Sequence, residues 1–367
     1  TCLVDLGTGK GDGGPVDVPA AEVAAHHLEG AGAVLLGDDR GRAVTAMADA
    51  FSHFVRTRSD IGGMIGAGGS GNTALVASGM RALPLGVPKI LVSTVASGDV
   101  APYVGPNDIA MIYSVADVAG LNSITRSVLG NAAHALSGMI QHKVPHVPAE
   151  KPAIGLTMFG VTTVCVDQVR ELLDAEYDCL VFHATGTGGR TMEDIVAGGF
   201  VSGVLDITTT EWADELMGGV MAAGTSRLDA AASSGVPQVV VPGCLDMVNF
   251  WGIDTVPKEY RDRRLYQWNS NITLMRTTPQ ENAELGRVLA EKVNRSSAPV
   301  ALFLPLNGLS ILGGTDGEFW WPEADKALFD AIVEHTREDI PVYKMANNIN
   351  DDDFADAVVS KMLEFLS

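Results

Sequence analysis

Several residue types are scarce in this chain, and each shortage narrows the classes of protein to which it can belong. Of its 367 residues only 4 are cysteines, Cys2, Cys165, Cys179 and Cys244, and no C-x-x-C pair occurs, which favours reduced, buried thiols in a cytosolic protein. Positively charged residues are also few. The chain has 25 Lys and Arg but 45 Asp and Glu, and the resulting net charge of −20 argues against nucleic acid or an anionic membrane as a partner. No apolar run reaches membrane-spanning length, so the sequence predicts a cytoplasmic protein without a membrane segment.

The chain also lacks an initiator methionine. It begins Thr-Cys-Leu-Val-Asp, and residues 2–6 already have the pattern of a short strand. We therefore expect the true N-terminus to lie upstream of the first residue.

Strand patterns and helical patterns alternate along the whole chain, which predicts α/β architecture with parallel sheets. Residues 141–152 hold three prolines and mixed charge without an apolar period, as is typical of a linker. We predict two Rossmann-like domains, 1–143 and 152–367, with a ligand crevice at the C-terminal ends of their strands and between them. Residues 257–267 are expected to form a charged excursion from the second domain.

The sequence is organised around residues 59–76, which read as a short buried strand, a glycine turn and a helix. The turn, 66–73, has glycine at four positions, with Ser70, Asn72 and Thr73 between or after them. A helix that begins there would present unpaired N–H groups and a positive dipole end, which suits a phosphate or carboxylate. It is neither a Walker A loop nor a G-x-G-x-x-G fingerprint. The alternative is a tight turn whose glycines serve packing and whose Ser70 is a plain helix cap.

Polar residues follow most of the predicted strands of the second half. Since parallel strands end at one edge of a sheet, we expect these side chains to line a single crevice. Within it, the segment 185–190 resembles a second phosphate cradle with a guanidinium attached. Each residue also has a structural reading: His183 as a core histidine, Asp206 and Asp246 as helix caps or turn residues, and the threonines as strand formers.

Five ordered motifs, at 68–73, 92–100, 158–163, 182–190 and 245–250, carry a resemblance over essentially the whole chain. The sequence resembles the family that contains the ATP-binding domain of the tomato mosaic virus resistance protein and its bacterial and fungal relatives. The resemblance implies two α/β domains, nucleotide binding and a homodimer. Members begin with a strand and a Gly-Thr-x-Asp-Thr-Lys-Gly loop that this sequence lacks, and we expect a truncated chain.

These observations lead to one preferred hypothesis, an ATP-dependent enzyme that acts on a small anionic or carbonyl metabolite between the two domains. The phosphates of ATP, with Mg²⁺, would be bound by Gly68, Gly69, Ser70, Gly71, Asn72, Thr73, Ser93, Thr94, Ser97, Gly98 and Asp99. The acid, base or Mg²⁺ partners would be His183, Asp206, Glu211 and Asp246. The substrate would be bound by Thr162, Thr163, Thr185, Gly186, Thr187, Gly188, Gly189, Arg190 and Asn249.

Two alternatives remain open at this level. The chain could be a nucleotide-binding regulator without turnover, as the inhibitory role of the plant relative suggests. It could also be an ATP-independent lyase or hydrolase whose glycine loops bind the phosphate or carboxylate of the substrate itself.

Overall fold

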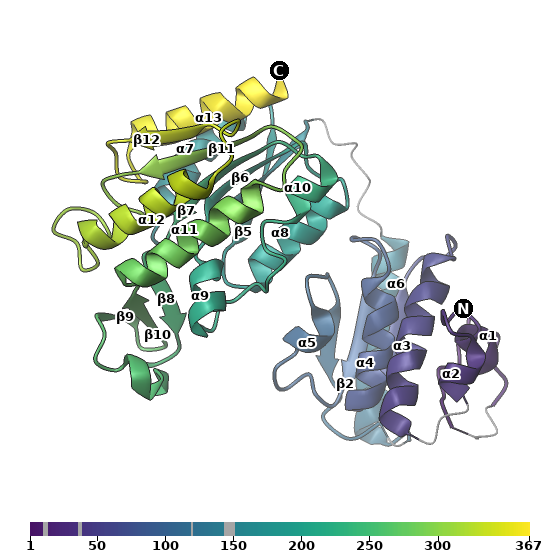
Figure 1. Ribbon diagram of the computed structural model, residues 1–367. Helices are drawn as coiled ribbons and strands as arrows, with labels where there is room; N and C mark the ends of the chain where they lie inside the picture. The colour runs from purple at the N-terminus through teal and green to yellow at the C-terminus, as the bar shows by residue number, and fades with distance from the viewer. Residues whose placement is uncertain (10–13, 36–38, 119, 143–150) are drawn as a thin grey trace. The chain divides into compact units, whose positions relative to one another are not determined.

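The computed structural model describes residues 1–9, 14–35, 39–118, 120–142 and 151–367 (Figure 1). The chain divides into two compact units, Thr1–His146 and Val147–Ser367. Each contains a parallel sheet with helices packed on it, so the predicted α/β class with Rossmann-like domains is confirmed. Most of the predicted linker, from 143 to 150, lies outside the described residues.

The N-terminal unit is built on a three-stranded parallel sheet in the order β1-β2-β3, with β1 at Met64–Gly68, β2 at Lys89–Ser93 and β3 at Ala110–Tyr113. Side chains alternate across β2: Leu91 packs with α4, whereas Ile90 and Val92 pack with α6. The two helices therefore cover opposite faces of the sheet. The helices of this unit are α1 (Ala20–Ala24), α2 (Ala31–Leu35), α3 (Arg40–Arg56), α4 (Ser70–Arg81), α5 (Ala101–Val104) and α6 (Ser123–Gln141).

The strand predicted at residues 2–6 is wrong. This segment makes only an isolated parallel bridge, between Val4 and Val18, held by bonds such as Asp5 N–H to the carbonyl of Val18. Its apolar residues Val4 and Leu6 are partly buried against the cluster formed by α1, α2 and α3. The strand-like pattern thus reflects packing on helices rather than membership of a sheet.

The C-terminal unit has a six-stranded parallel sheet in the order β12-β11-β7-β6-β4-β5. Numbered within this sheet alone, the first five strands follow the 2-1-3-4-5 order of flavodoxin-like doubly wound sheets. The direction of winding reverses between the neighbouring strands β4 and β6. The strands are β4 (Ala153–Met158), β5 (Asp178–His183), β6 (Gly203–Thr208), β7 (Gln238–Gly243), β11 (Val300–Pro305) and β12 (Val342–Met345).

Helices cover both faces of this sheet, as the yellow helix α13 and the green helix α11 show in Figure 1. One face packs against α7 and α13, with Val166, Phe354 and Val358 in its core. The other face packs against the remaining helices, with Leu285 and Leu328 where α11 meets α12. The helices are α7 (Thr163–Leu173), α8 (Thr187–Ala197), α9 (Glu211–Met217), α10 (Ala230–Ser234), α11 (Pro279–Val293), α12 (Pro322–His335) and α13 (Asp352–Leu366).

A second, antiparallel sheet in the order β8-β10-β9 includes the end of the expected charged excursion, 257–267, whose first part holds the 3-10 helix Lys258–Tyr260. It comprises β8 (Met247–Phe250), β9 (Leu265–Asn269) and β10 (Ile272–Arg276). The Asn269 side chain accepts bonds from Asn271 N–H (2.8 Å) and Ile272 N–H (3.0 Å), which closes the turn of the β9–β10 hairpin.

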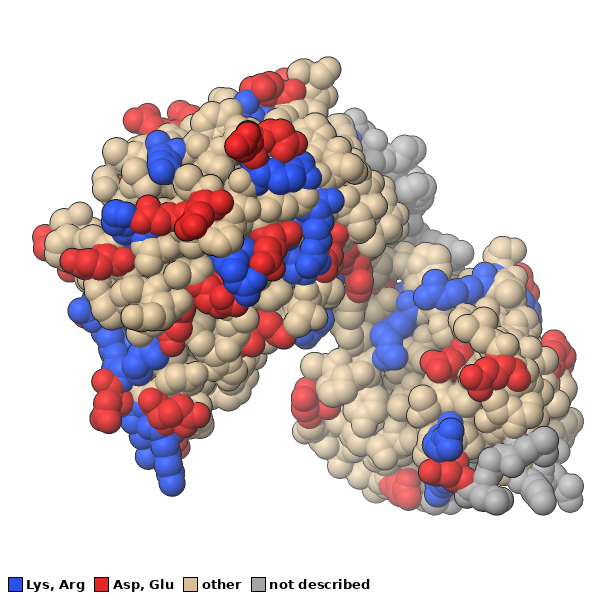
Figure 2. Space-filling model, viewed as in Figure 1, with Lys and Arg blue, Asp and Glu red and all other residues tan. Residues whose placement is uncertain are grey.

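The distribution of surface charge and the unpaired state of the cysteines agree with what the composition predicts. On the face shown in Figure 2, Lys and Arg side chains are interspersed with Asp and Glu instead of forming one large basic patch. All four cysteines are unpaired; Cys165 and Cys244 are buried, and Cys2 is exposed. No helix in the described part of the chain is both long and apolar enough to cross a bilayer.

Candidate functional site

The glycines of the turn between β1 and α4 fall into two groups. A Cβ on Gly66 would lie 2.4 Å from Val76 Cγ1, and one on Gly68 would lie 2.5 Å from the Cβ of Asn72, so packing requires both glycines. A Cβ on Gly71 would meet nothing within 4 Å, and one on Gly69 would meet only Thr94 Oγ1 at 3.7 Å. Packing therefore explains Gly66 and Gly68 but leaves Gly69 and Gly71 unexplained.

The N-terminus of α4 is open. Its N-cap residue is Gly69, with φ −79° and ψ −173°, and no side chain caps the helix. Ser70, Gly71 and Asn72 are exposed at this end. The first N–H groups of a helix have no partner within the helix, so the turn directs donors and the positive end of the dipole toward solvent. Ser70 begins the helix and does not cap it, in contrast to the plain-cap alternative.

Two buried hydroxyl groups hold this turn against the loop that follows β2. Thr73 Oγ1 lies 2.6 Å from Ser93 Oγ, and neither residue is exposed to solvent. Thr73 Oγ1 also donates to the carbonyl of Gly69 (2.9 Å), and Ser93 Oγ accepts from Val95 N–H (3.2 Å). Thr73 and Ser93 thus fix the geometry of both loops from below. Thr94 is partly exposed above them.

The rest of the β2 loop has a mixed role. Ser97, Gly98 and Asp99 are exposed, as expected for residues that meet a ligand. Asp99 Oδ1 accepts the N–H of Ala101 at 3.0 Å, at the start of α5. One carboxylate oxygen of Asp99 therefore has a structural partner, and the other is available.

The end of β3 adds two residues that the sequence analysis missed, Ser114 and Val115. Ser114 is 1% exposed, and its hydroxyl has no hydrogen-bond partner among the described residues. Val115 has φ +65°, which is rare and strained for a β-branched residue. Since β1, β2 and β3 are parallel, their ends share one edge of the sheet, and Ser114 N–H donates to the carbonyl of Ser93 (3.1 Å). Neither the strain nor the burial has a signal in the sequence.

In the C-terminal unit, threonine hydroxyl groups link β4 and the loop after it to the end of β6. Thr162 Oγ1 lies 2.8 Å from Thr208 Oγ1, and Thr157 Oγ1 donates to Asp206 at 2.8 Å. All four residues are at most 1% exposed. The sequence predicts that Thr162 and Asp206 line an open crevice; the structure brings them together but buries them. Thr163, at the start of α7, is partly exposed and donates to backbone carbonyls of its own turn.

Arg227 is the centre of this buried network, and the sequence analysis missed it. Its guanidinium binds both oxygens of Asp206 (2.5 and 2.7 Å), Glu211 Oε2 (2.7 Å) and Glu193 Oε1 (3.2 Å). Arg227 is 1% exposed, and the carboxylates hold its pKa well above the ordinary value. Burial raises the pKa of Glu193. One signal was available: Arg227 is the only Lys or Arg between Arg190 and Lys258.

The segment 185–190 does form an anion cradle, but the chain's own Glu211 fills it. Glu211 Oε1 accepts the N–H groups of Gly186 (2.6 Å) and Gly189 (3.0 Å) at the N-terminus of α8. A Cβ on Gly189 would lie 2.0 Å from the Glu211 carboxylate, and one on Gly188 would lie 1.8 Å from the carbonyl oxygen of His183. These glycines therefore permit close contacts within the protein.

The remaining residues of this segment lie at the surface of α8. Thr187 and Arg190 are exposed and Thr185 is partly exposed. Arg190 donates to the carbonyl of Ala222 (3.0 Å) and to Thr187 Oγ1 (3.3 Å). Its guanidinium thus ties α8 to the loop after α9 and retains further free donors.

Asp246 and Asn249 each belong to a buried group of hydrogen-bonded side chains, and both lie in the segment that follows β7. Asp246 accepts from Ser310 Oγ (2.7 Å), burial raises its pKa, and its other oxygen has no partner among the described residues. Asn249 donates through its backbone N–H (2.9 Å) and through Nδ2 (2.6 Å) to Asp214. Burial raises the pKa of Asp214 to about 7. Sequence reasoning had not singled out Asp214 or Ser310.

His183 is the most accessible of the four predicted catalytic residues. It ends β5, is exposed, and lies edge-to-face with Phe159 at a ring distance of 5.4 Å. Partial burial lowers its pKa, against an opposing effect of Glu211. The strand before Asp246 is β7, three positions from β5 in the sheet, so the two strand ends are about 14 Å apart. The structure does not bring His183 and Asp246 together.

No metal site is formed by protein groups alone in the part of the chain that the structure describes, since no three His, Cys, Asp or Glu side chains gather suitably there. Asp206 and Glu211 are instead neutralised by Arg227. An ion brought by a nucleotide would have to keep phosphate or water ligands.

Comparison with known proteins gives matches along both units. The model for the N-terminal domain of uncharacterised protein family UPF0261 matches residues 1–145, and the model for its C-terminal domain matches residues 151–366. A UPF0261 protein of Rhizobium meliloti is 50% identical over 363 residues, which cover 98% of this chain and 90% of that protein. One of Clostridium tetani is 50% identical over 333 residues, 89% of this chain and 82% of that protein.

A plant relative extends the comparison. The ToMV resistance protein Tm-1(GCR237) of Solanum lycopersicum is 42% identical over 360 residues, which are 95% of this chain and 48% of the tomato protein. The predicted resemblance to this tomato protein and to bacterial relatives is confirmed, while nucleotide binding stays a prediction. Matched over both of its units, the chain belongs to the uncharacterised protein family UPF0261.

Proposed function

We propose that this protein binds ATP, with Mg²⁺, through the N-terminal unit and uses it to act on a small anionic or carbonyl metabolite. One observation carries the nucleotide part: the exposed N-terminus of α4, where Gly69 is the N-cap and no side chain caps the helix. A helix N-terminus with free N–H groups is a site for phosphate. Gly69 and Gly71, which packing does not require, would let a phosphate approach the backbone closely.

The groups around the turn between β1 and α4 also favour a nucleotide phosphate as the ligand. Ser70, Thr94 and Ser97 supply exposed or partly exposed hydroxyl groups around the turn, and the buried pair Thr73 and Ser93 keeps the two loops in place. In a protein of net charge −20, neutral donors and a helix dipole attract an anion where few cations are available. We assign to Asp99, whose second carboxylate oxygen has no bond in the described structure, the contact with a nucleotide-bound Mg²⁺ through water.

For the chemical step, we propose His183 as the group that transfers a proton. Asp206 and Glu211 are buried and bound by Arg227, and Asp246 is fully buried. His183 alone among the four is exposed, and its lowered pKa keeps the imidazole neutral at pH 7, as a general base requires. The homodimer implied by the resemblance remains a proposal that light scattering can test.

The phosphate site is tested by Ser70→Pro beside Ser70→Ala. Proline at the first position of α4 removes one N–H, and the extended conformation of Gly69 is the one that a residue before proline prefers. The alanine variant loses only the hydroxyl group. We expect Ser70→Pro to weaken ATP binding by about tenfold or more and Ser70→Ala to weaken it less, measured by calorimetric titration with MgATP.

Gly71→Val and Gly138→Val provide a matched pair for the same site. Neither added side chain would meet anything within 4 Å, and both glycines are helical, Gly71 in α4 and Gly138 in α6. Valine at Gly71 should block the approach of a phosphate, whereas valine at Gly138 should leave binding unchanged. If Ser70→Pro and Gly71→Val both bind MgATP as the parent does, the turn is only a structural connection.

The role of His183 predicts an imidazole that titrates below its ordinary value of 6.5. Proton NMR over a pH series, with the signal assigned by its loss in His183→Asn, measures this pKa. The same variant should retain MgATP binding but lose ADP release in the presence of a substrate found by thermal-shift screening with small acids and carbonyl compounds. An imidazole that titrates above 6.5, or undiminished turnover in His183→Asn, would rule out this residue as the base.

A further inference from the structure

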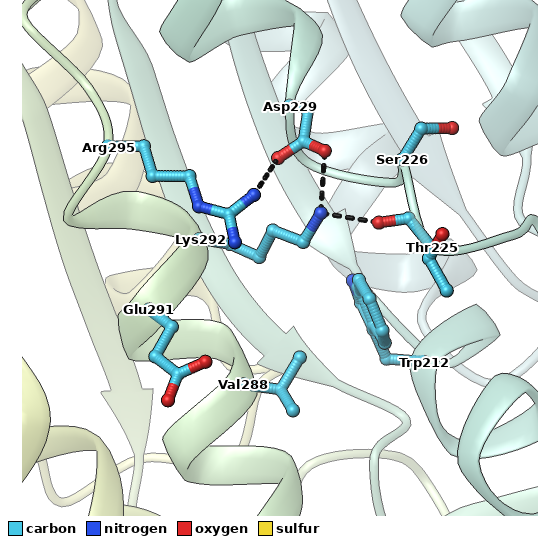
Figure 3. Close-up of a pocket in the computed structure, with 8 residues that line it drawn as sticks. All are labelled: Trp212, Thr225, Ser226, Asp229, Val288, Glu291, Lys292 and Arg295. Carbon is cyan, nitrogen blue, oxygen red and sulfur yellow. Dashed lines mark hydrogen bonds and ion pairs between the residues drawn. The ribbon is translucent and has the colours of Figure 1, made fainter.

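A pocket on the C-terminal unit lies far in sequence from every predicted site segment except the start of α9. It has a volume of about 440 Å³ and is lined by Trp212 of α9, residues of the loop before α10, and side chains of α11 (Figure 3). This volume falls within the range of about 300–1,000 Å³ that is usual for small-molecule sites. The lining residues are Trp212, Thr225, Ser226, Asp229, Val288, Glu291, Lys292 and Arg295.

The two cations of the pocket gather on one of its two acids. Asp229 is shared between two cations: its Oδ2 accepts from Lys292 Nζ at 2.7 Å, and its Oδ1 from Arg295 at 3.1 Å (Figure 3). The other acid, Glu291, shares Arg287, one turn earlier on α11, with Glu284. Lys292 and Arg295 therefore face a single carboxylate, in a protein whose acidic residues greatly outnumber its basic ones.

Free donors converge on the same point. Lys292 Nζ uses two of its three N–H groups, on Asp229 and on the carbonyl of Thr225, and its ammonium lies 5.1 Å from the centre of the Trp212 ring. Trp212 is 5% exposed, and its indole N–H has no acceptor in the described structure. An indole nitrogen can only donate, so what this group lacks is an acceptor oxygen. Arg295, with a side chain 58% exposed, keeps further donors at the rim.

The end of α11 does not oppose a negative ligand. The carbonyl groups of a helix C-terminus are normally a negative pole. Here Arg337 donates to the carbonyls of Asn294 and Ser296 directly after the helix. These bonds satisfy two carbonyl groups next to Arg295, and Asp339 balances the charge of Arg337.

We propose that this pocket binds a small organic anion, with its carboxylate or phosphate group against Lys292, Arg295 and the indole N–H of Trp212. A ligand oxygen supplies the acceptor that the indole N–H lacks. Val288 and the indole ring supply the apolar wall, and the exposed hydroxyls of Thr225 and Ser226 supply polar contacts for the rest of the molecule. This inference does not depend on nucleotide binding by the N-terminal unit.

Tryptophan emission tests the proposal without interference from the N-terminal unit. All 5 tryptophans, Trp212, Trp251, Trp268, Trp320 and Trp321, lie in the C-terminal unit. The whole chain is titrated separately with inorganic phosphate and with succinate while emission is recorded. We expect a saturable change with at least one of the two anions, and which of them binds more tightly distinguishes a phosphate from a carboxylate ligand.

Two variants and a charge-matched control complete the test. Arg295→Gln, at an exposed position, should weaken binding by about tenfold. Trp212→Phe keeps an aromatic ring but removes the donor, and it should abolish the emission change and weaken binding measured by calorimetry. Lys326→Gln removes one exposed cation from α12, where it pairs with Asp330, and should bind as the parent does. The proposal is overturned if neither anion gives a saturable change, or if Lys326→Gln loses as much affinity as Arg295→Gln.

Discussion

Replacing Arg227 by methionine should lower the free energy of unfolding of the C-terminal unit by about 3–5 kcal/mol. The guanidinium is 1% exposed and neutralises Asp206 and Glu211, which are equally buried. Without it, two carboxylates remain in a medium that solvates charge poorly, and they repel each other. Urea unfolding followed by tryptophan emission measures the change, because all tryptophans belong to this unit.

An exposed arginine of the same chain provides the control. Arg287 on α11 is also bound to two carboxylates, Glu284 and Glu291, but its side chain is 39% exposed. Arg287→Met should cost no more than about 1 kcal/mol, since water solvates the released charges. Adding Asp206→Asn to Arg227→Met should recover part of the loss. Equal effects of Arg227→Met and Arg287→Met would show that burial does not govern the strength of this network.

A pH dependence of stability is expected from Asp214. Burial raises its pKa from 3.8 in the unfolded chain to about 7 in the folded one. Between these values the folded state binds a proton that the unfolded state releases, so stability is lost as pH rises from about 4 to about 7. A shift of this size corresponds to at most about 4 kcal/mol.

The variant Asp214→Asn isolates this contribution. An amide at position 214 carries no charge at any pH, so the variant removes this titration. The difference in unfolding free energy between Asp214→Asn and the parent should therefore increase with pH over this window. Glu215→Gln removes a charge from the next residue of α9 and should keep the parent profile. A difference curve for Asp214→Asn that is flat from pH 4 to 7 would contradict the raised pKa.

Local sequence patterns predicted the elements that local physics determines. The apolar run 153–158 forms β4, and α11 begins where Thr278 and Pro279 indicate, with Thr278 and Glu281 forming a capping box. The antiparallel sheet was not predicted, because β8 has a polar centre at Asn249 and its partner β10 comes more than twenty residues later. Pairing across such a distance depends on the whole fold.

Local sequence patterns are limited in the same way for the candidate sites. The sequence indicates two glycine turns at helix N-termini and cannot tell what occupies each. Glu211 fills the cradle at the N-terminus of α8, where its bond to Arg227 holds it. At the N-terminus of α4, by contrast, no described side chain caps the helix. Similarly, Gly66 and Gly71 are equivalent in the sequence, and only the distance to Val76 shows that one serves packing and the other does not.

The strand order of the C-terminal sheet has a consequence for synthesis on the ribosome. Every strand after β4 pairs with a strand that has already been made: β5 and β6 with β4, β7 with β6, β11 with β7, and β12 with β11. The sheet can therefore grow outward as the chain emerges. The face that carries Leu156 and Val241 receives α13 last, from the C-terminal end of the chain. A nascent chain thus exposes an apolar sheet face until α13 has emerged from the ribosome, and chaperones should bind it during that interval.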